Sequence, residues 1–351
     1  MKRYQALIPG VSGVVGRRLA EHLVASGEWD VIGLARRPPA DPAGYRVIGV
    51  DLTDAGACRT ALAGLGDITH VLYCARYDHK TAASEPIDAN LAMLRNVLDA
   101  IEPAASGLRH VHLVQGSKYY GSELGPYKTP ARESDPRVLV DNWYYAQEDF
   151  TIERSRGKSW TWSASRPHGI CDHAPGIARS MAMVIAAYAA ISKELGQPLR
   201  FPGTRGNFQA IYQVVEATLL AKAIAWISTN PECGGQAFNV TNGDYIRWVN
   251  LWPRFAEFFR MEPGPVKTLR LAQAMSDKAP VWDRIVQKHG LKPTPYERAA
   301  LWSYGDFIFT PDYDMMSDTL KLRRYGFWES IDSEEMFLAL FAHFRRQKII
   351  P

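Results

Sequence analysis

Three glycines spaced three residues apart, Gly10, Gly13 and Gly16, directly follow an apolar stretch at residues 6–9. The residues after them, 14–24, have the hydrophobic periodicity of an amphipathic helix. In such a turn the first glycine permits the tight bend, the second lets the backbone approach a pyrophosphate, and the third lets the helix pack close to the strand. Free N–H groups at the helix start favour a bound phosphate. The pattern therefore predicts a dinucleotide site rather than a merely tight turn.

The end of the next predicted strand, residues 30–35, indicates which dinucleotide is bound. Chains that select NAD usually carry an acidic residue there, which binds the ribose 2′-hydroxyl. This chain has Arg36 and Arg37 instead, and guanidinium groups can bind a 2′-phosphate with paired hydrogen bonds. The sequence thus predicts NADPH rather than NADH. The alternative is that both arginines are simply solvated in a loop.

Strands and helices alternate through the first half of the chain. We expect further strands at 45–50, 70–74, 110–114 and 160–164, and helices at 55–65, 87–101 and 142–154. This alternation predicts an α/β fold with a doubly wound parallel Rossmann sheet. We therefore assign residues 1–167 to an NADP(H)-binding domain.

After Pro167 the pattern becomes mainly helical. We expect helices at 180–195, 214–228, 248–259, 269–289 and 332–346, and short strands at 199–201 and 237–240. Residues 168–351 are predicted to form a smaller substrate-binding region, with some strands returning to the main sheet. This region should cover the carboxyl ends of the strands, where such sheets bind ligands.

The composition limits the other functions open to this chain. With 46% hydrophobic and 22% charged residues and a net charge of +4, it is typical of a globular protein and does not indicate nucleic-acid binding. Its four cysteines form no CxxC pair, which is typical of reduced thiols in the cytoplasm. We expect no signal peptide, no membrane span and a small-molecule partner. A homodimer is left open.

Two segments near the carboxyl ends of the predicted strands carry candidate proton donors. Lys118 follows the strand at 110–114, and Tyr145 lies near the start of the helix at 142–154. A tyrosine phenol has a pKa near 10, and a nearby ammonium group lowers that pKa. Lys118 and Tyr145 are therefore predicted to act as a pair above the cofactor. Alternatively, Tyr145 is a packing aromatic and Lys118 a surface residue.

The glycine turn, Asp51-Leu52, Asn90 and Arg166-Pro167 together resemble the extended short-chain dehydrogenase/reductase superfamily. Those enzymes act through Ser, Tyr and Lys, with the Lys four residues after the Tyr. Here Tyr144 and Tyr145 are followed at that distance by Glu148 and Asp149, and Gly116 stands about where the serine is expected.

This departure resembles one branch, the progesterone 5β-reductase/iridoid synthase-like enone reductases. In that branch the lysine lies in a Gly-x-Lys segment, matched by residues 116–118, and the tyrosine in an Asn-aromatic-Tyr-Tyr-x-x-Glu-Asp segment, matched by 142–149. The resemblance, which covers nearly the whole chain, implies that Tyr145 is the catalytic tyrosine and Lys118 its partner. It implies cofactor contacts at Gly10, Ser12, Gly13, Val14, Gly16, Arg36, Arg37, Asp51, Leu52, Cys74, Ala75, Lys118, Tyr145 and Ile170.

The resemblance also implies the reaction. A hydride from NADPH would add to the β-carbon of an α,β-unsaturated carbonyl compound, while Tyr145 and Lys118 stabilise the enolate oxygen. Two alternatives stay open: a carbonyl reductase or alcohol dehydrogenase on the same fold, and a non-catalytic NADP(H)-sensing regulator.

Other conspicuous residues have simpler interpretations. Plant members carry a tryptophan where this chain has the segment 74–78, so we expect a more polar pocket wall containing Arg76 and Tyr77. The segment 168–173 matches no common zinc spacing, so we expect no metal, and Cys171 is interpreted as a packing residue. Four aromatic residues are either core residues or a cap over an apolar substrate: Trp302, Tyr304, Phe307 and Phe309.

Overall fold

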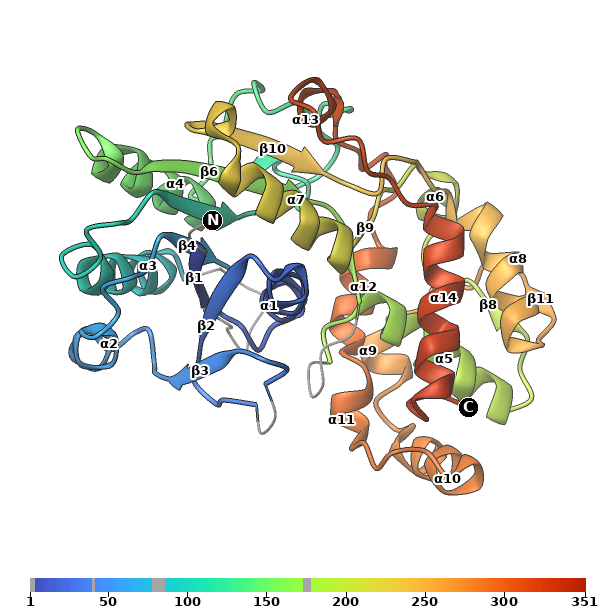
Figure 1. Cartoon of the computed structure of the whole chain (residues 1–351). Helices are drawn as coiled ribbons and strands as arrows, with labels where there is room; N and C mark the ends of the chain where they lie inside the picture. Colours follow the sequence, from blue (N-terminus) through green and yellow to red (C-terminus); the bar gives the residue numbers. More distant parts are fainter. Residues whose placement is uncertain (1–3, 40–41, 78–85, 173–177) are drawn as a thin grey trace.

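The computed structural model of the chain describes residues 4–39, 42–77, 86–172 and 178–351. A seven-stranded sheet, in which every strand pair is parallel, runs through the amino-terminal part (Figure 1). In spatial order its strands are β3 (Arg46–Gly49), β2 (Trp29–Ala35), β1 (Tyr4–Pro9), β4 (His70–Tyr73), β5 (His110–Val114), β6 (Thr161–Pro167) and β10 (Gln236–Val240). The strand order reverses between β1 and β4, which is where a doubly wound sheet binds its ligand.

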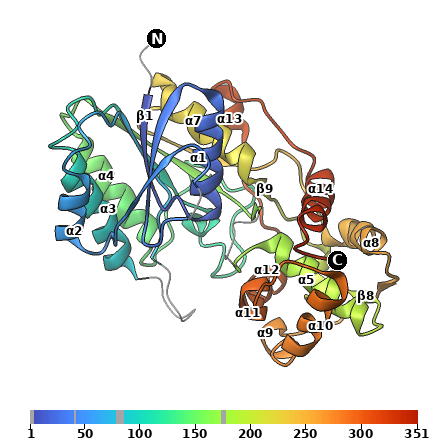
Figure 2. The same cartoon turned by 60° about the horizontal axis from the view of Figure 1, so that its bottom comes forward.

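Helices cover both faces of this sheet, as the two views show (Figures 1 and 2). On one face lie α2 (Ala55–Leu62), α3 (Ile87–Ile101) and α4 (Trp143–Ser155), and on the other lie α1 (Val14–Ser26) and α7 (Ala217–Thr229). Each layer encloses its own apolar cluster, because strand side chains alternate between the two faces. Leu7 and Val71 point into the first cluster, and Ile8 and Leu72 into the second. The predicted doubly wound sheet is confirmed.

The later part of the chain is mainly helical and is centred on α5 (Met181–Glu194), whose side chains are buried along almost its whole length. Its other helices are α6 (Arg205–Gln209), α8 (Trp248–Phe259), α9 (Leu271–Ala274), α10 (Ala279–His289), α11 (Tyr296–Ala299), α12 (Trp302–Phe309), α13 (Leu320–Arg324) and α14 (Ser333–Arg346). Two short parallel pairs join β7 (Ile170–Cys171) to β9 (Val215–Glu216) and β8 (Leu199–Arg200) to β11 (Pro263–Gly264). The strand β10 and helix α7 return to the main sheet, and a division near Pro167 remains our prediction.

The single helix predicted at 269–289 is wrong. The structure has two helices there, α9 and α10, with residues 275–278 between them. Pro280 lies in the first turn of α10, where its missing N–H costs nothing, whereas within a continuous helix its ring would clash with the preceding turn. Pro280 thus indicates, from the sequence alone, that a new helix begins there. Among the helices of the described ranges, none has both the length and the apolar character needed to cross a membrane.

Candidate active site

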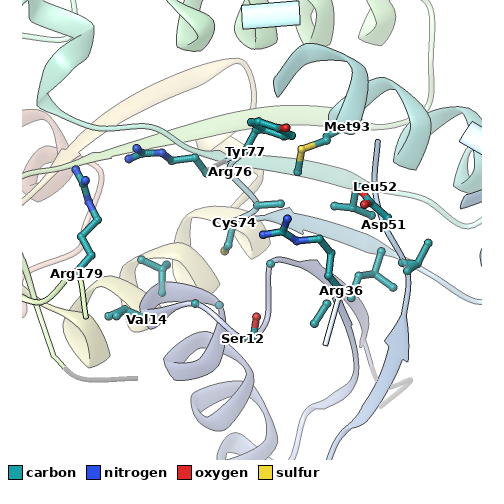
Figure 3. Close-up of a pocket in the computed structure, with 18 of the residues that line it drawn as sticks. Ser12, Val14, Arg36, Asp51, Leu52, Cys74, Arg76, Tyr77, Met93 and Arg179 are labelled. Atoms are coloured by element: carbon teal, nitrogen blue, oxygen red, sulfur yellow. The ribbon is translucent and has the colours of Figure 1, made fainter. Parts of the chain in front are cut away.

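A cavity of about 370 Å³ lies at the carboxyl ends of the sheet strands, beside the reversal in strand order (Figure 3). Segments that follow four neighbouring strands supply most of its wall. Its lining includes Gly10, Ser12, Gly13, Val14, Gly16, Arg36, Asp51, Leu52, Cys74, Ala75 and Ile170. These are predicted cofactor contacts, and the fold brings them together. Three other predicted contacts are not among the lining residues: Arg37, Lys118 and Tyr145.

The glycine turn between β1 and α1 is shaped by two close backbone approaches. Gly10 has a φ of +87°, and a Cβ there would lie 2.7 Å from the Ala75 backbone. A Cβ on Gly16 would lie 2.4 Å from the Gly10 carbonyl oxygen, so only glycine allows α1 to start this close to β1. By contrast, a Cβ on Gly13 would make only an ordinary contact, 3.4 Å from that oxygen. The space beside Gly13 therefore belongs to the cavity, as a backbone that approaches a pyrophosphate requires.

The end of the cavity beside β2 and β3 combines a cation with a carboxylate. Arg36 and Asp51 lie near each other in Figure 3. The backbone N–H and the hydroxyl of Thr53 both donate hydrogen bonds to Asp51, at 3.0 and 2.8 Å. These bonds, with a smaller effect from Arg36, lower the pKa of Asp51. Asp51 is thus held ionised, and no acidic residue occupies the end of β2 itself.

The opposite wall is fixed by a buried carboxylate that bridges two parts of the fold. Asp172, only 2% exposed, follows β7 and accepts hydrogen bonds from Arg17 (3.2 Å) and Arg18 (3.0 Å) on α1. The Ser180 hydroxyl also donates to the Asp172 carbonyl, at 2.6 Å. These contacts clamp the segment after β6 onto the helix of the glycine turn, which positions Ile170 at the cavity.

Asn142, the residue before α4, joins the two segments that carry the candidate proton donors. Its amide donates to the Lys118 carbonyl at 3.0 Å, and its side-chain oxygen accepts from the Tyr144 N–H at 2.9 Å. The short helix η1 (Ser117–Tyr120) and the first turn of α4 are therefore held together. The backbone of Lys118 thus lies near the start of the helix that carries Tyr144 and Tyr145, and the predicted pairing of the Lys118 ammonium with Tyr145 remains a prediction.

The two adjacent tyrosines have different surroundings. Tyr145 donates to the Tyr119 carbonyl (2.5 Å) and accepts from the Val138 N–H (3.2 Å), and its ring packs edge-on against Tyr119. The Tyr144 hydroxyl instead lies beside Gly116, where a Cβ would come within 3.0 Å of it. The lack of a side chain at Gly116 therefore makes room for the Tyr144 hydroxyl.

Glu148, four residues after Tyr144, is turned away from the cavity into a buried polar network. It accepts hydrogen bonds from Arg166 (3.1 Å), Gln115 (2.9 Å) and the Tyr119 hydroxyl (2.9 Å). Arg137 contributes another at 2.9 Å. Burial acts to raise the pKa of Glu148, but Arg166 and Arg137 outweigh it, so the pKa lies below its ordinary value. Glu148 thus anchors η1, the segment that carries Lys118, through its hydrogen bond with the Tyr119 hydroxyl.

Sequence reasoning missed part of the cavity wall and left another part undecided. Arg179 was not predicted, because it lies near no motif and reaches the cavity only through the packing of α5. Four aromatic residues were predicted to be either core residues or a cap over the substrate. Of these, Tyr304 lines the cavity, and Phe307 is 37% exposed. Trp302 and Phe309 are buried in the core of the helical region.

In the predicted segment 168–173, His168, Cys171 and Asp172 are buried, and His173 lies outside the described residues. Burial lowers the pKa of His168 to about 4, and its ring lies 4.7 Å from that of Tyr212. Cys171 is fully buried, and burial raises the pKa of its thiol. Among the residues that the structure describes, no three histidine, cysteine or acidic side chains gather into a metal site.

The fold and sequence both have known counterparts. A short-chain dehydrogenase/reductase superfamily protein from Agrobacterium tumefaciens, solved with NAD, has a TM-score of 0.67 at 16% identity, covering 99% of this chain and 98% of that one. The UDP-glucose 4-epimerase of Thermus thermophilus also gives 0.67, at 18% identity and with 97% and 99% coverage. At these identities the likeness shows the fold alone.

Two curated relatives are much closer in sequence. An (S)-8-oxocitronellyl enol synthase from Nepeta cataria is 35% identical over 99% of this chain and 91% of its own length. A 3-oxo-Δ(4,5)-steroid 5β-reductase from Arabidopsis thaliana is 35% identical over 99% and 93%. Residues 31–351 also match the model of the PRISE-like Rossmann-fold domain. The chain therefore belongs to the PRISE-like Rossmann-fold family, which confirms the resemblance to progesterone 5β-reductase and iridoid synthase-like enone reductases and the enzyme class predicted from it.

Proposed function

We propose that this protein uses NADPH to reduce the activated C=C bond of α,β-unsaturated carbonyl compounds. The observation that carries this proposal is the Asn142 bridge, which joins the backbone carbonyl of Lys118 to the backbone N–H of Tyr144 near the carboxyl ends of the sheet strands. The relative from Arabidopsis thaliana is named as a reductase of a steroid with a 3-oxo group and a Δ(4,5) double bond, an enone. When bound, NADPH would supply the hydride that adds to the β-carbon.

The residues of this chain would stabilise the charge that develops on the substrate oxygen. We propose that the Tyr144 hydroxyl donates a hydrogen bond to the carbonyl oxygen as it becomes an enolate, with the Lys118 ammonium adding positive charge nearby. The position of the Tyr144 hydroxyl beside Gly116 supports Tyr144 in this role. Tyr145, the donor favoured by the sequence, donates its hydroxyl to the Tyr119 carbonyl and is the alternative donor that the variants below test.

Oxidation of NADPH in the presence of simple enones, with identification of the product, tests the proposed reaction. We expect the saturated ketone. An allylic alcohol would instead identify a carbonyl reductase on the same fold, because hydride would then have added to the carbonyl carbon. Binding of NADPH with no turnover of any enone or ketone would favour the non-catalytic regulator.

NADPH is expected to bind more tightly than NADH by about ten- to hundredfold, because a phosphate–guanidinium contact adds charge-assisted hydrogen bonds. Arg36 lines the cavity, and no acidic residue stands at the end of β2. Calorimetric titration of both cofactors against the wild type and the Arg36→Ala/Arg37→Ala variant measures this difference. Arg109→Ala, an exposed change at the amino end of β5, serves as control. Equal wild-type affinities would contradict the preference.

Valine at Gly13 and at Gly16 should have different effects. Gly13 is in an extended conformation, with space for a Cβ, so Gly13→Val should fold normally but lose detectable NADPH binding as its methyl groups enter the cavity. Gly16→Val should lower the free energy of unfolding by about 1–3 kcal/mol, because its Cβ would overlap the Gly10 carbonyl. Urea unfolding and cofactor titration separate the two. Normal NADPH affinity in Gly13→Val would mean that this turn does not hold the phosphates.

The homodimer that the sequence left open and the cytoplasmic location expected from it both remain proposals. Light scattering on the purified protein measures the first directly, and imaging of a tagged chain tests the second.

A further inference from the structure

The end of the cavity away from Arg36 carries two more arginines, Arg76 and Arg179. Arg76 comes from the segment after β4, and Arg179 lies just before α5. In Figure 3 both side chains extend toward the same end of the cavity. The only carboxylate among the described lining residues is Asp51, which lies beside Arg36 at the other end. Among the described residues, this end of the cavity, here called the cationic end, therefore carries two guanidinium groups.

The segment that bears Arg76 is held in place by Asn90 on α3. The Asn90 side-chain oxygen accepts from the Tyr77 N–H at 2.9 Å, and its amide donates to the Pro86 carbonyl at 2.9 Å. The Gln147 amide donates to the Asn90 carbonyl at 2.8 Å. A buried network thus fixes the backbone next to Arg76. The fold, and not a free loop, therefore determines where the Arg76 side chain begins.

Helix α12 connects this cationic end to the reaction site. The Arg179 guanidinium lies 4.4 Å from the centre of the Tyr304 ring. Tyr304 stacks on Phe307 with ring centres 6.2 Å apart, and the Lys118 ammonium lies 5.6 Å from the Phe307 ring. Burial raises the pKa of Tyr304, while Arg179 and Arg76 both act to lower it, so both charges act on this phenol. The two rings of α12 therefore lie between Arg179 and Lys118.

We propose that Arg76, Arg179 and Tyr304 bind a carboxylate carried by the enone substrate, remote from its reacting double bond. The proposal rests on the reductase activity proposed above and names its substrate class. A guanidinium matches a carboxylate with two parallel hydrogen bonds. The Tyr304 ring fixes the plane of Arg179 in advance, which lowers the entropy cost of binding. The aromatic pair of α12 would cover the apolar part of the substrate between its carboxylate and its enone.

A matched substrate pair tests this proposal: 6-oxohept-4-enoate, an enone with a terminal carboxylate, and its neutral methyl ester. We expect wild-type kcat/KM to favour the acid by about tenfold or more, the value of one charge-assisted interaction. In Arg179→Met and Arg76→Met this ratio should fall toward one. Arg284→Met, an exposed change on α10, is the control and should keep the wild-type ratio.

Three outcomes would overturn the carboxylate site. One is a wild-type ratio at or below one, and another is a ratio that Arg179→Met does not change. The third is an equal loss for acid and ester accompanied by weaker NADPH binding, which would assign Arg179 to the cofactor phosphates. Reduction of neither substrate would refute the reductase proposal instead. In that case binding of the saturated acid, 6-oxoheptanoate, decides the site: weaker binding to Arg179→Met supports it, and unchanged binding overturns it.

Discussion

Tyr144→Phe is expected to lower kcat for enone reduction by about a hundred- to thousandfold, the usual cost of removing one oxyanion donor. The ring is kept and only the hydroxyl beside Gly116 is lost, so NADPH affinity should change little. Tyr145→Phe is the matched control on the neighbouring residue. It removes a hydrogen bond to the Tyr119 carbonyl, which should cost about 1 kcal/mol of folding free energy and only a few-fold in turnover.

Lys118 should belong to the same catalytic unit. Lys118→Met should reduce kcat strongly, and the Tyr144→Phe/Lys118→Met double variant should be little slower than the slower single variant, because residues that act as a unit are not additive. Steady-state turnover on a weakly activated enone measures all of these variants, since such a substrate depends most on enolate stabilisation. Wild-type turnover in Tyr144→Phe, with a large loss in Tyr145→Phe, would restore Tyr145 as the donor.

Glu148→Ala is expected to lower the free energy of unfolding by about 3–5 kcal/mol, the usual cost of breaking a buried ion pair by removing one partner. Arg166 is 3% exposed, and it would lose its carboxylate at 3.1 Å. Glu153→Ala, on the same helix, is the matched control. Its ion pair with Arg156 leaves both side chains 70% exposed, so its loss should cost less than about 1 kcal/mol. Urea unfolding at neutral pH measures both variants, and similar small losses would contradict the buried role of Glu148.

The same ion pair predicts a pH dependence. Because the pKa of Glu148 is lower in the folded chain than its ordinary value of 4.5, its ionisation stabilises the fold fully above that value. The contribution is lost as the pH falls through the lowered folded pKa. The difference in unfolding free energy between the wild type and Glu148→Gln should therefore be constant near neutral pH and shrink below about pH 4. A difference that stays constant to lower pH would refute the depressed pKa.

The sequence alone was enough for the fold class and for most of the residues that line the candidate cofactor cavity. The conformation of the glycine turn can be predicted from its own residues, because the local backbone tolerates neither a Cβ at Gly16 nor a negative φ at Gly10. Arg36 and Asp51 could be assigned to the same edge because Arg36 directly follows the parallel strand β2 and Asp51 comes two residues after β3. Local rules of this kind need no knowledge of distant contacts. Pro280 also marks the break between α9 and α10 in the sequence. The apolar periodicity on both sides of it nevertheless suggested one continuous helix.

Only the tertiary structure distinguished Tyr144 from Tyr145. Adjacent residues on a helix point about 100° apart, so one tyrosine of the pair faces Gly116 while the other faces the Tyr119 carbonyl. The motif that contains both tyrosines does not show which of them faces Gly116, because that depends on where η1 and the end of β6 pack against α4. The place of Arg179 in the cavity wall could not be predicted for the same reason, since it also depends on tertiary packing. The sequence determined what its local backbone geometry requires, and the packing of segments far apart in the chain decided which side chains share the site.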